Sequence, residues 1–108
     1  MARGLARGQV RLCRFPRPDK ERPVVILTRE SAIGYLANVT IAPVTSTIRG
    51  VASEVRLSEI DGMKGPCVAN LHNVATIPKI HLGPVVAVLG PEKLREICAA
   101  MGYALGCV

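Results

Sequence analysis

The chain has 108 residues, of which 49% are hydrophobic, 20% are charged and 3% are aromatic. This composition excludes a disordered protein, and the length fits one domain over residues 1–108, with residues 1–6 expected as a flexible arm. No apolar run reaches the roughly 18 to 20 residues that a membrane-spanning helix needs. Residues 1–15 carry scattered arginines in place of the apolar stretch of a signal peptide, which predicts a cytoplasmic protein.

The excess positive charge is concentrated at the start of the chain. Lysine and arginine number 14 against 8 aspartate and glutamate, a formal net charge of +6. Residues 1–29 hold eight basic and two acidic residues, so the remainder of the chain is neutral overall. A concentrated basic segment attracts a polyanion such as a nucleic acid, although a solvated charged arm would have the same composition.

The cysteines and histidines are not spaced as metal ligands. The four cysteines form no CxxC pair, and His72 and His81 do not lie at zinc-ligand spacing from them. In a chain without a secretion signal, we expect the thiols to be small buried apolar groups or incidental surface groups. We therefore expect neither a structural metal nor a cofactor.

The first half of the chain predicts strands separated by breaks. Residues 8–15 alternate apolar and polar side chains, which indicates a strand with one buried face. The proline-rich segment 16–23 breaks regular structure and is expected to form an exposed, charged loop. The β-branched run at 24–27 predicts a strand that is buried on both faces.

A short helix and a further strand follow. The helix is expected over residues 28–35, with Thr28 or Ser31 as its N-cap. The strand covers residues 39–44, where Pro43 indicates a sheet edge or a bulge, because proline has no N–H for the ladder. A polar loop comes next.

The second half of the chain ends in a change of period. Residues 91–105 place apolar side chains at helical spacing, with Pro91 suited to the first turn and Gly106 suited to the stop. Many short strands before one amphipathic helix predict a mainly β, α+β fold, in which helices pack on a small, antiparallel, barrel-like sheet. The other expected strands are 53–57, 67–71, 74–77 and 85–89.

Two short motifs surround the expected strands after the proline-rich loop. Residues 21–27 read Glu-Arg-Pro-Val-Val-Ile-Leu, and residues 41–49 read Ile-Ala-Pro-Val-Thr-Ser-Thr-Ile-Arg. With an Arg-Gly pair at residues 7–8 and Ser-Glu-Val-Arg-Leu at residues 53–57, their order and spacing resemble the MazF/PemK family of toxins from bacterial toxin–antitoxin modules. The resemblance covers residues 7–106.

The resemblance implies a fold, an activity and partners. The fold is an SH3-like or CcdB-like barrel of antiparallel strands with a C-terminal α-helix, and the protein is a homodimer. The activity is that of a type II toxin, a sequence-specific, metal-independent endoribonuclease that cleaves single-stranded RNA. Attack by the 2′-hydroxyl leaves a 2′,3′-cyclic phosphate and a 5′-hydroxyl. The partner is a cognate MazE-like antitoxin.

The resemblance places the catalytic positions of the family at Arg22 and Thr45. A guanidinium is a rigid fork of donors for a dianionic phosphorane, and its high pKa makes it a poor proton donor, which favours an electrostatic role for Arg22. The Thr45 hydroxyl could bind the scissile phosphate or the 2′-hydroxyl. The alternatives without a catalytic role are a solvated arginine in a charged loop and threonines that satisfy turn backbone groups.

Several residues around these two are expected to contact RNA. The imidazole of His72 could also supply acid–base capacity near neutral pH, whereas a turn histidine bonded to backbone is the bland alternative. Segment 16–21 is short and lacks the Gly-Ser-Glu-Gln stretch common in the family, and Ala75 stands where many members have arginine. The expected RNA-binding residues are Ser46, Thr47, Phe15, Arg17, Lys20, His72 and Asn73.

Two other functions remain open from the sequence. A CcdB-type toxin binds DNA gyrase and performs no chemistry, and a catalytically inactive relative would bind RNA without cutting it. The Arg22-Pro23 pair and the Thr-Ser-Thr loop favour the nuclease over the gyrase binder, because protein binding does not need them. The altered stretch at residues 72–75 keeps the inactive relative open.

Overall fold

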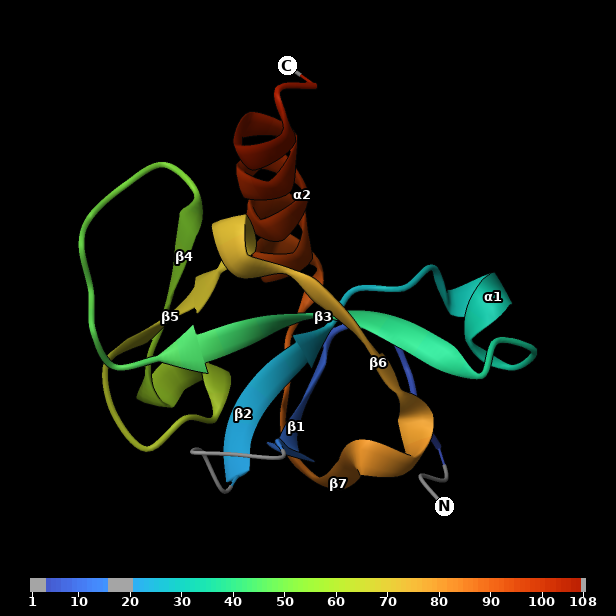
Figure 1. Cartoon of the computed structure of the whole chain (residues 1–108). Helices are drawn as coiled ribbons and strands as arrows, with labels where there is room; N and C mark the ends of the chain where they lie inside the picture. Colours follow the sequence, from blue (N-terminus) through green and yellow to red (C-terminus); the bar gives the residue numbers. More distant parts are fainter. Residues whose placement is uncertain (1–3, 16–20, 108) are drawn as a thin grey trace.

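The computed structural model describes residues 4–15 and 21–107, which form a curved sheet with one long helix packed on it (Figure 1). The strands are β1 (Gln9–Arg14), β2 (Glu21–Ile26), β3 (Asn38–Thr45), β4 (Glu54–Leu57), β5 (Cys67–Asn70), β6 (Ala75–Pro78) and β7 (Leu82–Val88). The α-helices are α1 (Glu30–Ile33) and α2 (Pro91–Leu105), and single 3-10 turns are η1 (Glu59–Asp61), η2 (Leu71–Asn73) and η3 (Lys79–His81).

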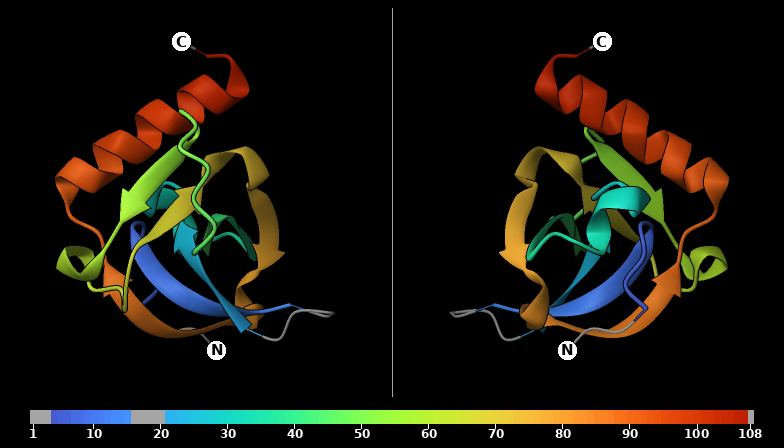
Figure 2. Two further views of the ribbon diagram at one scale, coloured as in Figure 1. Left: turned by 90° about the vertical axis from the view of Figure 1, so that its left-hand side faces the viewer. Right: turned by 90° about the vertical axis from the view of Figure 1, so that its right-hand side faces the viewer.

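Strand β3 is shared by two parts of the sheet. The strand order is β4-β5-β3-β2-β1-β7, β6 also pairs with β3, and all these pairs are antiparallel. On one side of β3, Val39 pairs with Ile77 of β6, whereas Val44 pairs with Ala69 of β5. The sheet curves into a barrel-like form with α2 across one end (Figure 2), which confirms the expected α+β fold.

The prediction that Pro43 marks a sheet edge or a bulge was wrong, because β3 lies in the sheet interior. Pro43 is opposite Val24 of β2. On the other side of β3, the described ladder with β6 ends at Ile41 and that with β5 begins at Val44. Proline is tolerated here because it sits where β3 changes partner, so a missing N–H costs less than in a continuous ladder.

The predicted loop at residues 16–23 was too long at its C-terminal end. Strand β2 already begins at Glu21, which pairs with Arg14, and Leu12 pairs with Pro23. Pairing with β1 draws these charged and proline residues into the ladder, although their local sequence favours a break. Residues 16–20 lie outside the part of the chain that the structure describes.

Burial on both faces of β2 confirms the prediction for residues 24–27. Val25 and Leu27 belong to the larger core cluster, which also includes Ile97 of α2. Val24 and Ile26 belong to a second cluster on the opposite face. A strand packed on both sides has little freedom to shift, because each register slip would exchange the two buried sets of side chains.

Helix α1 is shorter than predicted, and neither predicted N-cap was correct. The residue at the N-cap is Arg29, whose side chain makes no capping bond, and Ser31 lies inside the helix. The Thr28 hydroxyl instead accepts the backbone N–H of Thr40 in β3 at 2.7 Å. A tertiary contact therefore takes the side chain that the local pattern assigned to a cap.

The C-terminal helix and the cysteines follow the sequence predictions. Helix α2 begins at Pro91 and is closed by Gly106 in the left-handed conformation, with φ of 75°. All four cysteines are free. Cys13 and Cys67 are buried, and burial raises the pKa of both thiols, whereas the other two are exposed.

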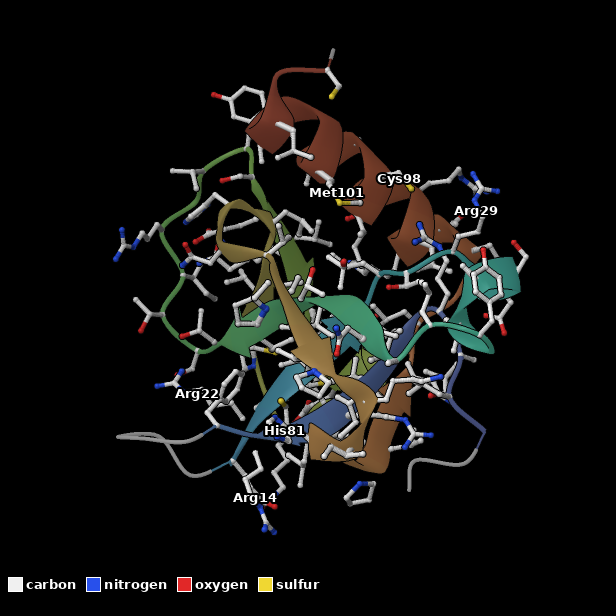
Figure 3. The ribbon with its side chains drawn as sticks, turned by 45° about the vertical axis from the view of Figure 1, so that its right-hand side comes forward. Arg14, Arg22, Arg29, His81, Cys98 and Met101 are labelled. Carbon is white, nitrogen blue, oxygen red and sulfur yellow. The ribbon has the colours of Figure 1, made fainter. Side chains whose placement is uncertain are left out.

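The basic residues of the N-terminal segment do not form one surface. Arg11 is only 5% exposed; its guanidinium donates to the carbonyl of Gly83 at 2.8 Å, and burial lowers its pKa. Arg14 and Arg22 lie near one end of the β1–β2 pair, whereas Arg29 lies beside α2 (Figure 3). The N-terminal basic residues therefore cannot all face one polyanion.

Gly8 links three elements where the chain enters β1. Its N–H donates to the Ile26 carbonyl at 2.9 Å, and its carbonyl accepts the N–H of Leu89 at 3.0 Å. It holds φ of 90°, and a Cβ there would lie 3.2 Å from both δ-methyl groups of Leu94 in α2. The position thus requires both left-handed backbone and a missing side chain.

We expect Gly8→Ala to lower the free energy of unfolding by about 1–3 kcal/mol, because alanine must adopt a strained backbone conformation under Leu94. Urea unfolding followed by circular dichroism measures this change. Gly34→Ala is the matched control, since Gly34 has φ of −66° and open space around it. Equal stability of the Gly8 variant and the wild type would contradict the prediction.

Candidate active-site cleft

A cleft of about 270 Å³ opens where several strand ends meet. Its lining comes from the start of β2, the end of β3, the loop after β3, the start of β4, the end of β5 and η2. The lining residues are Arg22, Pro43, Thr45, Thr47, Arg49, Glu54, Asn70 and Asn73. Both predicted catalytic residues and two of the predicted RNA-binding residues are thus in one place.

The register of β2 against β3 brings the two predicted catalytic residues together. Val24 pairs with Pro43 and Ile26 with Ile41 in the antiparallel ladder. Continuing this register by two residues sets Arg22 opposite Thr45. Side chains two residues apart on a strand share a face, so both project from the face that carries Val24 and Pro43. The arginine is exposed, and the threonine is half-buried.

The Thr45 side chain is oriented by the loop that it begins. Its Oγ1 accepts the backbone N–H of Thr47 at 3.1 Å. This contact is the turn hydrogen bond expected if Thr45 only satisfies the backbone of the loop. It also affects the chemistry of the hydroxyl. With an oxygen lone pair engaged, the hydroxyl proton remains available to donate, so Thr45 is better suited to bind an anionic oxygen than to take up a proton.

Glu54 fixes the loop on the opposite wall. Its Oε1 accepts the N–H groups of Arg49 at 3.1 Å and Gly50 at 2.9 Å, and its Oε2 lies 3.3 Å from the same Arg49 nitrogen. Partial desolvation would raise the pKa of this carboxyl, but the backbone N–H groups, with a smaller contribution from His72, outweigh it and leave the pKa below its ordinary value. The group is therefore ionised at neutral pH.

His72 lies beside the cleft and does not line it. It is in η2 between Asn70 and Asn73, and its backbone N–H donates to Asn70 Oδ1 at 3.2 Å. Its ring nitrogen Nδ1 makes a hydrogen bond with the hydroxyl of Ser53, which is buried. The ring thus bonds a side chain, whereas the bland interpretation expected backbone.

Two further predicted RNA-binding residues, Ser46 and Phe15, do not line the cleft. Ser46 is exposed in the loop after β3 and does not line the cleft. Phe15 is half-buried and packs against the second core cluster, which ties its ring to the fold. Arg17 and Lys20 lie outside the described residues.

Four residues of the cleft were not expected there from the sequence: Pro43, Arg49, Glu54 and Asn70. Both Arg49 and Glu54 stand inside the quoted motifs, so their place in the motif was a usable signal. Asn70 has no such signal, because it reaches the cleft through pairing with Glu54 across β4 and β5. Only the sheet order makes these two residues neighbours.

A second, larger cavity of about 500 Å³ is lined by none of the residues that were predicted to bind RNA or to catalyse its cleavage. It is lined by Arg7, Arg29, Glu30 and Ser31, and the Arg7 backbone N–H donates to Glu30 Oε1 at 2.8 Å. Within residues 4–15 and 21–107, no group of three or more His, Cys, Asp or Glu side chains could hold a metal ion. No helix in the same ranges is long and apolar enough to cross a membrane.

A family model and several known proteins match this chain. A family model for the PemK-like, MazF-like toxin of type II toxin–antitoxin systems matches residues 6–105. Endoribonuclease MazF3 of Mycobacterium tuberculosis is 42% identical over 86 residues, which cover 80% of this chain and 84% of that protein.

Two solved structures show how closely the fold agrees. The Mycobacterium tuberculosis toxin MazF-mt6 superposes with a TM-score of 0.83 at 37% identity, covering 91% of this chain and 96% of that one. A mycobacterial endoribonuclease in complex with its cognate antitoxin gives a TM-score of 0.86 at 26% identity, covering 97% and 98%. The chain belongs to the PemK-like, MazF-like toxin family of type II toxin–antitoxin systems.

Proposed function

We propose that this protein is an endoribonuclease toxin that cleaves single-stranded RNA in the cleft between β2 and the loop after β3. Family membership supports the endoribonuclease activity. The observation that carries the placement of the site is that Arg22 and Thr45, which come from different strands, line one cleft together. Neither a gyrase binder nor a structural protein needs this pairing.

The proposed reaction uses the RNA as its own nucleophile. The 2′-oxygen forms a bond to phosphorus while the bond from phosphorus to the 5′-oxygen breaks, which leaves a 2′,3′-cyclic phosphate and a 5′-hydroxyl without a metal. Negative charge grows on the phosphoryl oxygens in the transition state. Donors fixed in advance at these oxygens stabilise that charge most effectively.

Arg22 and Thr45 supply such donors. The guanidinium donates two parallel N–H groups to the phosphoryl oxygens, and the threonine hydroxyl donates a third bond from the neighbouring strand. Arg49 adds a second positive charge to the same cleft. These groups favour the phosphorane over the monoanionic substrate, because their electrostatic attraction strengthens as its charge increases.

The two proton transfers need another group. The 2′-hydroxyl must lose a proton and the 5′-oxygen must gain one, and neither an arginine nor a threonine does this well near neutral pH. His72 is the candidate, because it is exposed and lies between two cleft residues. Its Nδ1 is bonded to Ser53, so Nε2 is the nitrogen that would exchange the proton.

RNA binding extends beyond the reacting phosphate in this proposal. Thr47 and Asn73 line the cleft, where a hydroxyl and an amide can bond base edges or phosphates. Ser46, Phe15, Arg17, Lys20 and His72 are proposed as contacts of the flanking nucleotides.

The proposed biological setting is that of the family. A mycobacterial relative has been solved in complex with its cognate antitoxin, and we expect a MazE-like antitoxin, rich in acidic and apolar residues, to bind this basic protein. We also expect a homodimer that acts in the cytoplasm. An inactive RNA-binding relative remains the competing function, and cleavage distinguishes the two.

We expect Arg22→Ala to lower the cleavage rate about 10²- to 10³-fold, the cost of removing one transition-state donor. The assay uses a long mixed-sequence RNA in excess EDTA, with the 3′ ends analysed for cyclic phosphate. Arg29→Ala is the control, because Arg29 lies on another side of the molecule. Intact RNA with folded, antitoxin-free wild type would reject the nuclease.

Thr45→Val should lose about 10- to 100-fold in kcat, since valine matches the shape of threonine but cannot bond a charged phosphate. Thr45→Ser keeps the hydroxyl and should remain close to wild type. The measurement is single-turnover cleavage under saturating protein. A fully active valine variant would limit Thr45 to its turn bond with Thr47.

His72→Ala should remove one limb of the pH–rate profile of RNA cleavage, if His72 moves a proton in the reaction. His81→Ala is the matched control, because His81 is also an exposed histidine in a 3-10 turn and does not line the cleft. An unchanged profile in the His72 variant would remove His72 from the chemistry.

A further inference from the structure

An acidic side chain in an RNA-binding cleft needs an explanation. Glu54 lines the same cleft as Arg22 and Arg49, at the first residue of β4. Its carboxylate repels the phosphates that the two arginines attract, so in electrostatic terms alone it weakens RNA binding. A residue that opposes the main attraction must contribute something else to the site.

The hydrogen bonds of Glu54 identify that contribution. The carboxylate accepts backbone N–H groups from Arg49 and Gly50, four to five residues earlier in the chain. A bond between Glu54 N–H and the Val51 carbonyl at 3.0 Å closes the turn between them. The backbone carrying the Arg49 side chain is thus held on the start of β4, which is itself paired to β5.

The loop between Thr45 and Glu54 contains no helix or strand to hold it. At its first residue, Thr45 Oγ1 accepts the N–H of Thr47, and at its last residue Glu54 accepts the N–H groups described above. Both ends of the loop are therefore fixed by side chains that line the cleft. The bonds to the Glu54 carboxylate are charge-assisted, and such bonds are stronger than bonds between neutral groups.

The same bonds argue against Glu54 as the base of the reaction. Its Oε1 accepts two N–H groups, and these donors favour the ionised form. A carboxylate stabilised in this way is a weaker base than an ordinary one, and it is poorly suited to remove a proton from a 2′-hydroxyl. The electrostatic effect of His72 also lowers the pKa of this carboxyl, and the two other charged residues that line the cleft, Arg22 and Arg49, are both cationic.

We propose that Glu54 is a positioning residue: its carboxylate anchors the backbone of Arg49 and Gly50, so that Thr47 and Arg49 line the cleft opposite Arg22. The effect on RNA cleavage rests on the proposed function, whereas the anchoring itself does not. The negative charge is tolerated because the carboxylate accepts backbone N–H groups of the loop. Without these bonds the loop would not be held on β4.

The test uses two variants of nearly equal size. Glu54→Gln keeps an acceptor oxygen of similar reach, and Glu54→Met keeps the length but has no oxygen. Both should fold, because Glu54 lies on the face of β4 opposite the buried Val55 and Leu57, and Glu54→Ala replaces the methionine variant if that one does not. Glu92→Gln is the control for removing a carboxylate elsewhere, at the start of α2.

The first readout is the order of the loop in the protein alone. Amide ¹⁵N relaxation should give residues 47–50 of the wild type and the Gln variant order parameters near those of rigid backbone, about 0.85, and should give the Met variant values below about 0.6. Unchanged order in the Met variant would overturn the proposal. This readout needs no RNA and stands whether or not the protein is a nuclease.

The second readout is cleavage of the mixed-sequence RNA. We expect KM to rise about tenfold in the Met variant, the equivalent of one lost charged hydrogen bond, and to change about threefold or less in the Gln variant. A large and equal fall in kcat in both variants, with KM unchanged, would make Glu54 a catalytic base and overturn the proposal. No cleavage by wild type, with an ordered loop, would reject the nuclease and leave the anchor intact.

Discussion

The antiparallel register between β2 and β3 is the constraint on which the rest of the site depends. It sets the start of β2 beside the end of β3, so Arg22 and Thr45 lie across from each other on one face of the sheet. No loop has to find this arrangement, because both residues belong to strands. A guanidinium and a hydroxyl on paired strands have little backbone freedom left to lose, which is the preorganisation that the proposed RNA cleavage requires of its donors.

The register is secure because β2 is buried on both faces and β3 is shared. Val25 and Val24 belong to different core clusters, so a slip of one residue would exchange them. Strand β3 pairs with β2 on one side and with β6 and then β5 on the other. The change of partner lies at Pro43, which lines the cleft. The cleft thus opens where the sheet itself divides.

Residue type and apolar spacing within short segments predicted the elements of the fold that short-range sequence determines. The two-sided burial of residues 24–27 and the helix at 91–105 were predicted correctly, because a β-branched run and a helical apolar period are local signals, although β2 itself begins earlier, at Glu21. Thr28 was assigned to a cap that it does not make, since its hydroxyl bonds β3 instead. Glu54 was missed because its importance depends on how a loop returns to β4, and spacing alone does not specify that. The family motifs indicated Arg22 and Thr45, but only the register of β2 against β3 explains why both line one cleft.

Glu54 also shows why the charge of a nucleic-acid site is a poor guide to its parts. Counting charges would favour replacing this carboxylate, since it opposes the phosphates that Arg22 and Arg49 attract. Its two backbone partners, however, belong to the loop that carries Arg49 into the cleft, so the carboxylate helps to hold that loop in place. When RNA binds, an exposed arginine on an unfixed loop gains electrostatic attraction to phosphate but loses side-chain and backbone freedom. The entropic cost cancels part of the binding free energy that the attraction supplies. A fixed arginine has already lost the backbone part of that freedom during folding. Under the proposed function, the carboxylate therefore weakens the attraction for phosphate but keeps the loop ordered, and an ordered loop favours selective stabilisation of a dianionic transition state over the substrate.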